Sequence, residues 1–241
     1  MKDLKDLTQR LLPCVLALVA LMIFGTVSAF ADPITLQANT SGTFNAGASG
    51  ATVAGGGTMI TATAGGTSST ITFVSNPNQI NVALNPGEVS NVTLGVFNVT
   101  SNSTLPLGSG PSFGGATFSL TVSFTVPAGT TPQTFNGSLT GRIVQTGSTT
   151  EVQWTSPLTL TFVSASGTTF QLTIEPTTAI NPPLTNGVSN PPSQIRARIS
   201  VVTGPTGAIP EPSTLILLGS GLFGLATLAR RRFRAGNRAS R

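Results

Sequence analysis

Strict alternation of apolar and polar side chains over residues 116–126 limits how this chain can fold more than any other feature. Six apolar residues alternate there with five Ser or Thr residues. A period of two over this length gives one buried and one wet face, which is typical of a β-strand. Five further segments show similar alternation: residues 79–84, 89–94, 158–162, 170–174 and 195–201.

Weaker strand patterns fill most of the intervening chain: residues 34–38, 59–62, 70–74, 135–144 and 151–154. Turn residues such as Asn85-Pro86-Gly87 separate the strands, and no helical periodicity lies between them. The pattern predicts an all-β fold, an antiparallel β-sandwich, with a jelly roll as the alternative. Residues 41–69, rich in Gly, Ala, Thr and Ser, predict either a loose edge region or an extra pair of strands.

The end of the chain has a different character. Pro210-Glu211-Pro212 favours extended backbone, and residues 215–229 carry no charge. A helix of that length spans about 23 Å, which is short against a hydrocarbon core of about 30 Å. Arg230, Arg231 and Arg232 follow as a membrane stop, and clusters of arginine stay on the cytoplasmic side. The segment therefore predicts a short C-terminal transmembrane helix.

This order of Pro-Glu-Pro, short apolar helix and arginine-rich end resembles the PEP-CTERM sorting signal of Gram-negative bacteria. The resemblance covers residues 209–234. It implies that a membrane transpeptidase-like enzyme, an exosortase, processes the chain after transient anchoring in the inner membrane. It also implies a destination at the cell surface or in the extracellular polysaccharide. An ordinary C-terminal tail anchor is the alternative.

The N-terminus predicts a signal helix. Basic residues precede an apolar stretch over residues 11–27, and Ala29 and Ala31 supply a small-residue site for signal peptidase before Asp32. An uncleaved N-terminal anchor is the alternative. Cleavage would remove Cys14, the one cysteine, so the mature chain could form neither a disulfide nor a thiolate metal site.

These features divide the chain into four parts. We expect a signal peptide over residues 1–31, a β-sandwich passenger over 32–202, a linker over 203–208 and the sorting segment over 209–241. Within the passenger, residues 32–105 are either a looser sub-region or part of the same domain.

The passenger is almost uncharged. Residues 32–208 hold four acidic and three basic residues, a net charge of −1, so the basic isoelectric point belongs mainly to the tail. The charge distribution therefore does not indicate nucleic-acid binding.

Few residues are available for catalysis. The chain has no histidine, which excludes Ser-His-Asp and Cys-His catalysis and imidazole metal sites. Glu88, Glu151 and Glu175 could supply a glycosidase pair. Their scarcity, and the absence of two acids close together in the passenger, favour a protein with no enzymatic activity, no metal and no cofactor.

Two features of the passenger could contact a glycan. Trp154, the one tryptophan, could stack on a sugar ring, although a lone tryptophan in a sandwich more often fills the core. Arg196 and Arg198 share one face of a strand and could hold an acidic glycan. The simpler interpretation is that they are edge-strand charges that discourage aggregation.

Three functions fit these observations. The first is an exported, non-enzymatic component of the cell surface or matrix. The second is a carbohydrate-binding module or adhesin of the extracellular polysaccharide. The third is a secreted glycoside hydrolase.

Overall fold

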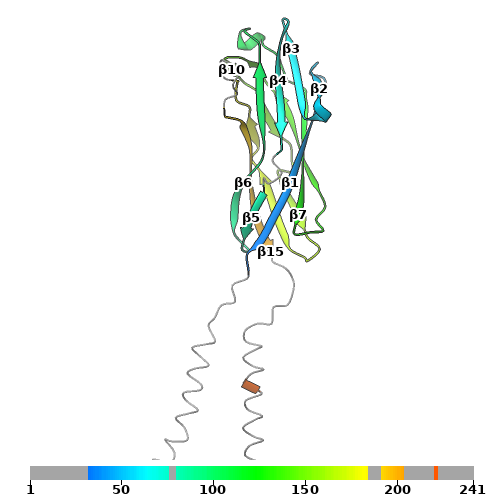
Figure 1. Cartoon of the computed structure of the whole chain (residues 1–241), viewed down its shortest axis with the longest axis vertical. Coiled ribbons are helices and arrows are strands. Elements are labelled where there is room, and N and C mark those ends of the chain that lie inside the picture. Colours follow the sequence, from blue (N-terminus) through cyan, green and yellow to red (C-terminus); the bar gives the residue numbers. More distant parts are fainter. Residues whose placement is uncertain (1–31, 76–79, 184–190, 204–219, 222–241) are drawn as a thin grey trace, which may run out of the picture. The chain divides into compact units, whose positions relative to one another are not determined.

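The alternating segments form antiparallel strands in the computed structural model of the chain (Figure 1), which describes residues 32–75, 80–183, 191–203 and 220–221. The strands lie in one compact unit that runs from Ala31 to Thr206. Every ladder between them is antiparallel, so the prediction of an all-β fold built from antiparallel sheets is confirmed.

Six strands form the first sheet, which contains the segment of strictest alternation as β7. In spatial order the strands are β14 (Thr177–Ala179), β11 (Glu151–Trp154), β8 (Gln133–Thr140), β7 (Thr117–Val126), β1 (Ile34–Asn45) and β5 (Ile80–Leu84). Along β7 the buried residues alternate with more exposed ones up to Phe124, as the pattern predicts.

Seven strands form the second sheet. In spatial order they are β12 (Thr159–Val163), β13 (Thr169–Ile174), β15 (Ser193–Thr203), β6 (Val89–Ser101), β4 (Thr67–Val74), β3 (Met59–Ala64) and β2 (Thr52–Ala54). The shortest elements are β9 (Ile143–Val144), β10 (Gly147–Ser148) and the 3₁₀ turns η1 (Gly55–Gly57) and η2 (Leu107–Ser109). β9 and β10 pair only with each other.

Residues 32–105 contribute strands to both sheets. β1 pairs with β7 in the six-stranded sheet, and β6 pairs with β15 in the seven-stranded sheet. These residues therefore do not form a sheet of their own. Within them, residues 41–69 contain the end of β1, the small-residue strands β2 and β3, and the start of β4.

The two sheets face each other across one hydrophobic core. Phe118 of β7 lies at a ring-centroid distance of 5.0 Å from Phe97 of β6 and 5.2 Å from Phe73 of β4. Further along, Phe124 of β7 lies 4.5 Å from Phe170 of β13. Each such buried ring stabilises the fold by roughly 1.5–3 kcal/mol relative to an exposed one.

Two glycines make room for this aromatic cluster. A Cβ atom at Gly42 of β1 would collide with the rings of Phe118 and Phe73, and one at Gly95 of β6 would also collide with Phe73. Glycine is therefore required at both positions for the sheets to approach this closely.

Both predicted terminal helices fall almost entirely outside the described residues. The signal helix lies within residues 1–31, and of the C-terminal helix only Ser220 and Gly221 are described, with helical backbone. Across the described ranges, no helix reaches the length and apolar character of a membrane span.

Candidate functional site

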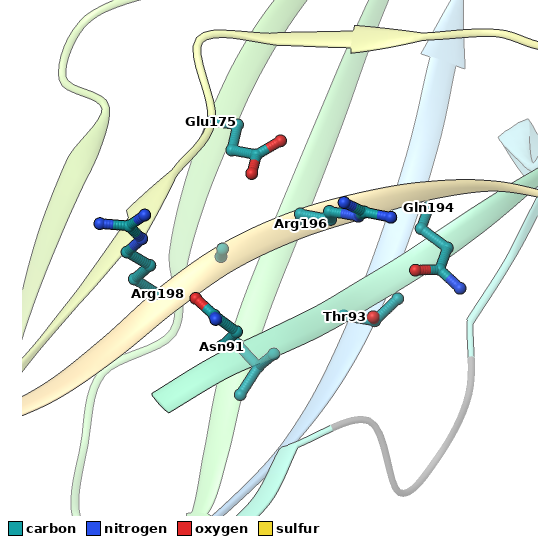
Figure 2. A pocket seen from close by; sticks show the side chains of 8 residues that line it. Asn91, Thr93, Glu175, Gln194, Arg196 and Arg198 are labelled. Carbon is teal, nitrogen blue, oxygen red and sulfur yellow. The ribbon is translucent and has the colours of Figure 1, made fainter. Parts of the chain in front are cut away.

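A polar hollow lies on the outer face of the seven-stranded sheet, where β15 and β6 run side by side (Figure 2). We call it the arginine hollow, and its volume is about 280 Å³. Figure 2 shows β15 passing between Glu175 on one side and Asn91 and Thr93 of β6 on the other. Its lining residues are Asn91, Val92, Thr93, Glu175, Gln194, Arg196, Ala197 and Arg198.

The hollow lies where β13 leaves the sheet. β13 pairs with β15 as far as Ile174 and Ala197, and the Glu175 backbone N–H then donates to the Arg196 carbonyl at 3.2 Å. The chain next crosses to the other sheet, where the Pro176 carbonyl accepts a hydrogen bond from the Trp154 backbone N–H. β15 therefore has no pairing partner from β13 beside Gln194. The chain that follows β14 passes there instead, and the Asn181 backbone N–H donates to the Ser193 hydroxyl at 2.7 Å.

A β-bulge in β6 lies beside the hollow. Ile195 pairs with Gly95 but Arg196 pairs with Thr93, so Leu94 is the extra residue on β6. The buried hydroxyl of Thr40, from β1 on the facing sheet, donates to the Leu94 carbonyl at 2.6 Å. Bulges bend a strand and redirect its side chains. Here the bulge is held in place from the core.

The two arginines lie on an internal strand. Arg196 and Arg198 are both exposed, and their side chains alternate with the buried Ile195, Ala197 and Ile199 along β15. β15 has β13 on one side and β6 on the other, so the interpretation of these residues as edge-strand charges is wrong. Sheet order depends on long-range pairing, which the local sequence pattern does not reveal.

The polar side chains of the hollow do not bind one another. Among the described residues, no hydrogen bond or ion pair involves the side chains of Arg196 or Arg198, of Glu175, or of their neighbours Asn91 and Gln194. The third arginine of the β-sheet unit differs, because the Arg142 guanidinium donates to the Gly110 carbonyl.

The three glutamates of the β-sheet unit lie in separate parts of the fold. Glu88 lies in the turn between β5 and β6, where its carboxylate accepts a hydrogen bond from the Asn85 backbone N–H at 2.7 Å. This bond, together with the Asn85 side chain, lowers the pKa of Glu88 below its ordinary value of 4.5. Glu151 begins β11 in the six-stranded sheet and accepts a hydrogen bond from Gln153. Glu175 lines the arginine hollow in the other sheet.

No metal centre emerges from the part of the chain that the structure describes. It contains no group of three or more Asp, Glu, His or Cys side chains placed to hold an ion.

Trp154 lies in the core. Its side chain is 6% exposed, its ring contacts Phe118 and Phe135, and its Nε1 donates to the Thr178 hydroxyl at 3.0 Å. The interpretation of Trp154 as a glycan contact is therefore corrected, because a buried indole cannot stack on a sugar from solvent.

Comparison with known proteins concerns the tail alone. Residues 208–232 match the family model of the PEP-CTERM protein-sorting motif. The chain carries a PEP-CTERM sorting motif. The motif implies that the protein is exported, crosses the membrane and is processed by an exosortase. No curated protein and no solved structure matches the chain significantly.

Most residues of the predicted sorting motif and signal peptidase site lie outside the part of the chain that the structure describes. Pro210, Glu211 and Pro212 fall within the matched residues, as do Arg230, Arg231 and Arg232. All six lie outside the described residues. The same holds for Ala29 and Ala31, whereas Asp32 is described and exposed, two residues before β1. The assignment of this junction to signal peptidase stays a prediction.

Sequence reasoning found only part of the hollow. It identified the arginines and Glu175, but it did not connect Asn91, Thr93 and Gln194 with them. The signal that could have revealed the rest is the set of polar positions in two alternating segments. These positions are Asn91 and Thr93 in one segment and Gln194, Arg196 and Arg198 in the other. Only the register of β6 against β15 brings these polar side chains together on one face.

Proposed function

We propose that this protein is an exported, non-enzymatic component of the cell surface or extracellular matrix, sorted by an exosortase. The observation that carries the proposal is the PEP-CTERM match at residues 208–232. In this proposal, signal peptidase removes residues 1–31 and the C-terminal helix holds the chain transiently in the inner membrane. Exosortase then acts near Pro210-Glu211-Pro212 and delivers the passenger to the envelope surface or the extracellular polysaccharide.

The composition of the passenger supports a structural or adhesive role. It has no histidine, and the one cysteine of the chain lies in the segment that we expect signal peptidase to remove. Its glutamates lie apart, in a turn, in β11 and directly after β13, and do not form a pair. Hydrolysis of a polysaccharide by the purified protein, lost on Glu151→Gln, would contradict the non-enzymatic role and favour a glycoside hydrolase.

We infer that the passenger is a β-sandwich rather than a jelly roll. Consecutive strands form hairpins in β2–β3–β4, β7–β8 and β12–β13. A jelly roll instead builds its two sheets from paired Greek keys of about eight strands.

The sorting proposal is tested by fractionation of a bacterium that contains exosortase. We expect wild-type passenger at the cell surface or in the medium, and a Glu211→Ala variant retained with the inner membrane. Glu151→Ala, a matched change in the β-sheet unit away from the arginine hollow, should behave as wild type. The proposal fails if wild-type protein stays in the inner membrane, or if Glu211→Ala is distributed as the wild type.

The second candidate function is that of a carbohydrate-binding module or adhesin. The arginine hollow favours it, because this hollow offers charged and hydroxyl-binding side chains that the fold itself does not use.

A further inference from the structure

We propose that the arginine hollow binds an acidic polysaccharide, one whose charges are carboxylates spaced along a sugar chain. The proposal rests on the proposed function only in placing the domain outside the cell, where such polymers occur. It assigns a ligand class and a binding surface, both on the outer face of β15 and β6.

The first argument for this proposal is the position of the charged side chains. The β-sheet unit has three arginines, and two of them lie on the same face of one strand, two residues apart. Like charges on one sheet face repel each other. Neither guanidinium has a hydrogen-bond or ion-pair partner among the described residues. Since the strand is internal, protection of a sheet edge does not explain them.

The second argument is the chemistry of the side chains that line the hollow. A guanidinium is always charged and presents a planar fork of donors that matches a carboxylate. Asn91, Thr93 and Gln194 add neutral amide and hydroxyl groups, which can both donate to and accept from sugar hydroxyls. This combination suits a ligand that carries carboxylates and hydroxyls together.

Glu175 narrows the ligand class. Its carboxylate lines the same hollow, so the net charge there is only one positive unit. A negative group beside the arginines disfavours polymers of high charge density, such as sulfated glycans or nucleic acids, and tolerates sparser carboxylates. It can also accept hydrogen bonds from sugar hydroxyls.

The shape of the hollow favours a polymer over a small molecule. Its volume of about 280 Å³ is close to the lower limit of small-molecule sites, and its lining is polar where such sites are mostly apolar. Gln194, Arg196 and Arg198 are all exposed along one face of β15. A linear chain can therefore lie across the face and extend beyond the hollow.

The test measures binding of the full-length chain to polygalacturonate, a uronate polymer, at low ionic strength. The protein is purified in mild detergent from a host without exosortase, so binding does not depend on sorting. We expect binding that weakens as salt is raised. The double variant Arg196→Gln/Arg198→Gln should weaken it by about tenfold or more, because two charge-assisted contacts are lost.

Glutamate variants test the sign of the effect. Glu175→Gln should strengthen binding to polygalacturonate and improve binding to heparin and single-stranded DNA, since it removes the repelling charge. Glu151→Gln is the matched control, because that residue lies on the six-stranded sheet, and it should leave affinity unchanged. All four side chains are at least partly exposed, so thermal unfolding should confirm that the variants fold.

Several outcomes would overturn the proposal. They are no binding of the wild type to polygalacturonate, equal binding to neutral dextran, or full binding by the double arginine variant. Equal affinity for DNA, unchanged by Glu175→Gln, would replace it with a general anion site. None of these outcomes affects the sorting proposal, which fractionation tests separately.

Discussion

The outer faces of two strand pairs use similar polar side chains in opposite ways. On the β7–β8 pair, the hydroxyls of Thr121 and Thr134 hydrogen-bond at 2.8 Å, and Ser119 donates to Asn136 at 2.7 Å. On the β15–β6 pair, the side chains of Arg196 and Asn91 have no such partner among the described residues. The first face stabilises the sheet, whereas the second leaves its donors available to a ligand.

The arginines repeat this difference. Arg142 donates to the Gly110 carbonyl and so fixes a loop, whereas Arg196 and Arg198 are exposed and line the arginine hollow (Figure 2). The chain has few charged residues. Exposed charged side chains without a hydrogen-bond or ion-pair partner among the described residues are therefore the best indication of a binding face.

The largest expected effect comes from the bond that holds the bulge beneath the arginine hollow. Thr40→Val keeps the shape of the side chain but removes the hydroxyl that donates to Leu94. A buried carbonyl without a partner costs about 1–3 kcal/mol, so the free energy of unfolding should fall by that amount. Chemical denaturation measures it. Polygalacturonate binding should weaken too, and an unchanged stability would show that the bulge does not need this bond.

A smaller effect is expected on the β7–β8 face. The double variant Thr121→Val/Thr134→Val removes one cross-strand hydroxyl pair, which contributes roughly 0.2–1 kcal/mol. Denaturation should show a loss in that range, while polygalacturonate binding stays as in the wild type. Weakened binding would mean that this face, and not the arginine hollow, meets the glycan.

The smallest effect on stability is expected from Glu88, in comparison with Glu175. Glu88 accepts the Asn85 N–H and has a lowered pKa, so its charged form stabilises the fold at neutral pH. That contribution is lost as pH falls through the pKa of folded Glu88, below 4.5. Glu88→Gln should therefore lower the thermal midpoint slightly at neutral pH but not in acid. Glu175→Gln should not lower it at either pH, and an equal loss in both variants would remove the contrast.

Local pattern was enough to predict most of the longer strands, but it did not predict β14 and it merged β8 with β9. The alternation over residues 116–126 became β7, and residues 151–154 became β11. It underestimated β1, which continues to Asn45 through a stretch whose small residues weaken the apolar signal. Gly42 in that stretch leaves space for the aromatic rings of the core. The need for a residue without a Cβ atom becomes visible only once the two sheets are packed together.

The candidate site was harder to predict than the strands. The sequence favours the core for Trp154 but leaves a glycan contact open. Its burial follows from contacts with β7 and β14, which lie far away in sequence. The sequence pattern favours an edge position for Arg196 and Arg198, because no local signal reports sheet order. The bulge at Leu94 arises from the pairing of two strands, so neither strand's sequence shows it.

The most direct test of the proposed sorting is the intact mass of the exported protein from a host that contains exosortase. The proposal requires a mature chain that begins at Asp32 and ends near residues 210–213, with the apolar segment removed. A mass that places the C-terminus at Arg241 would contradict it.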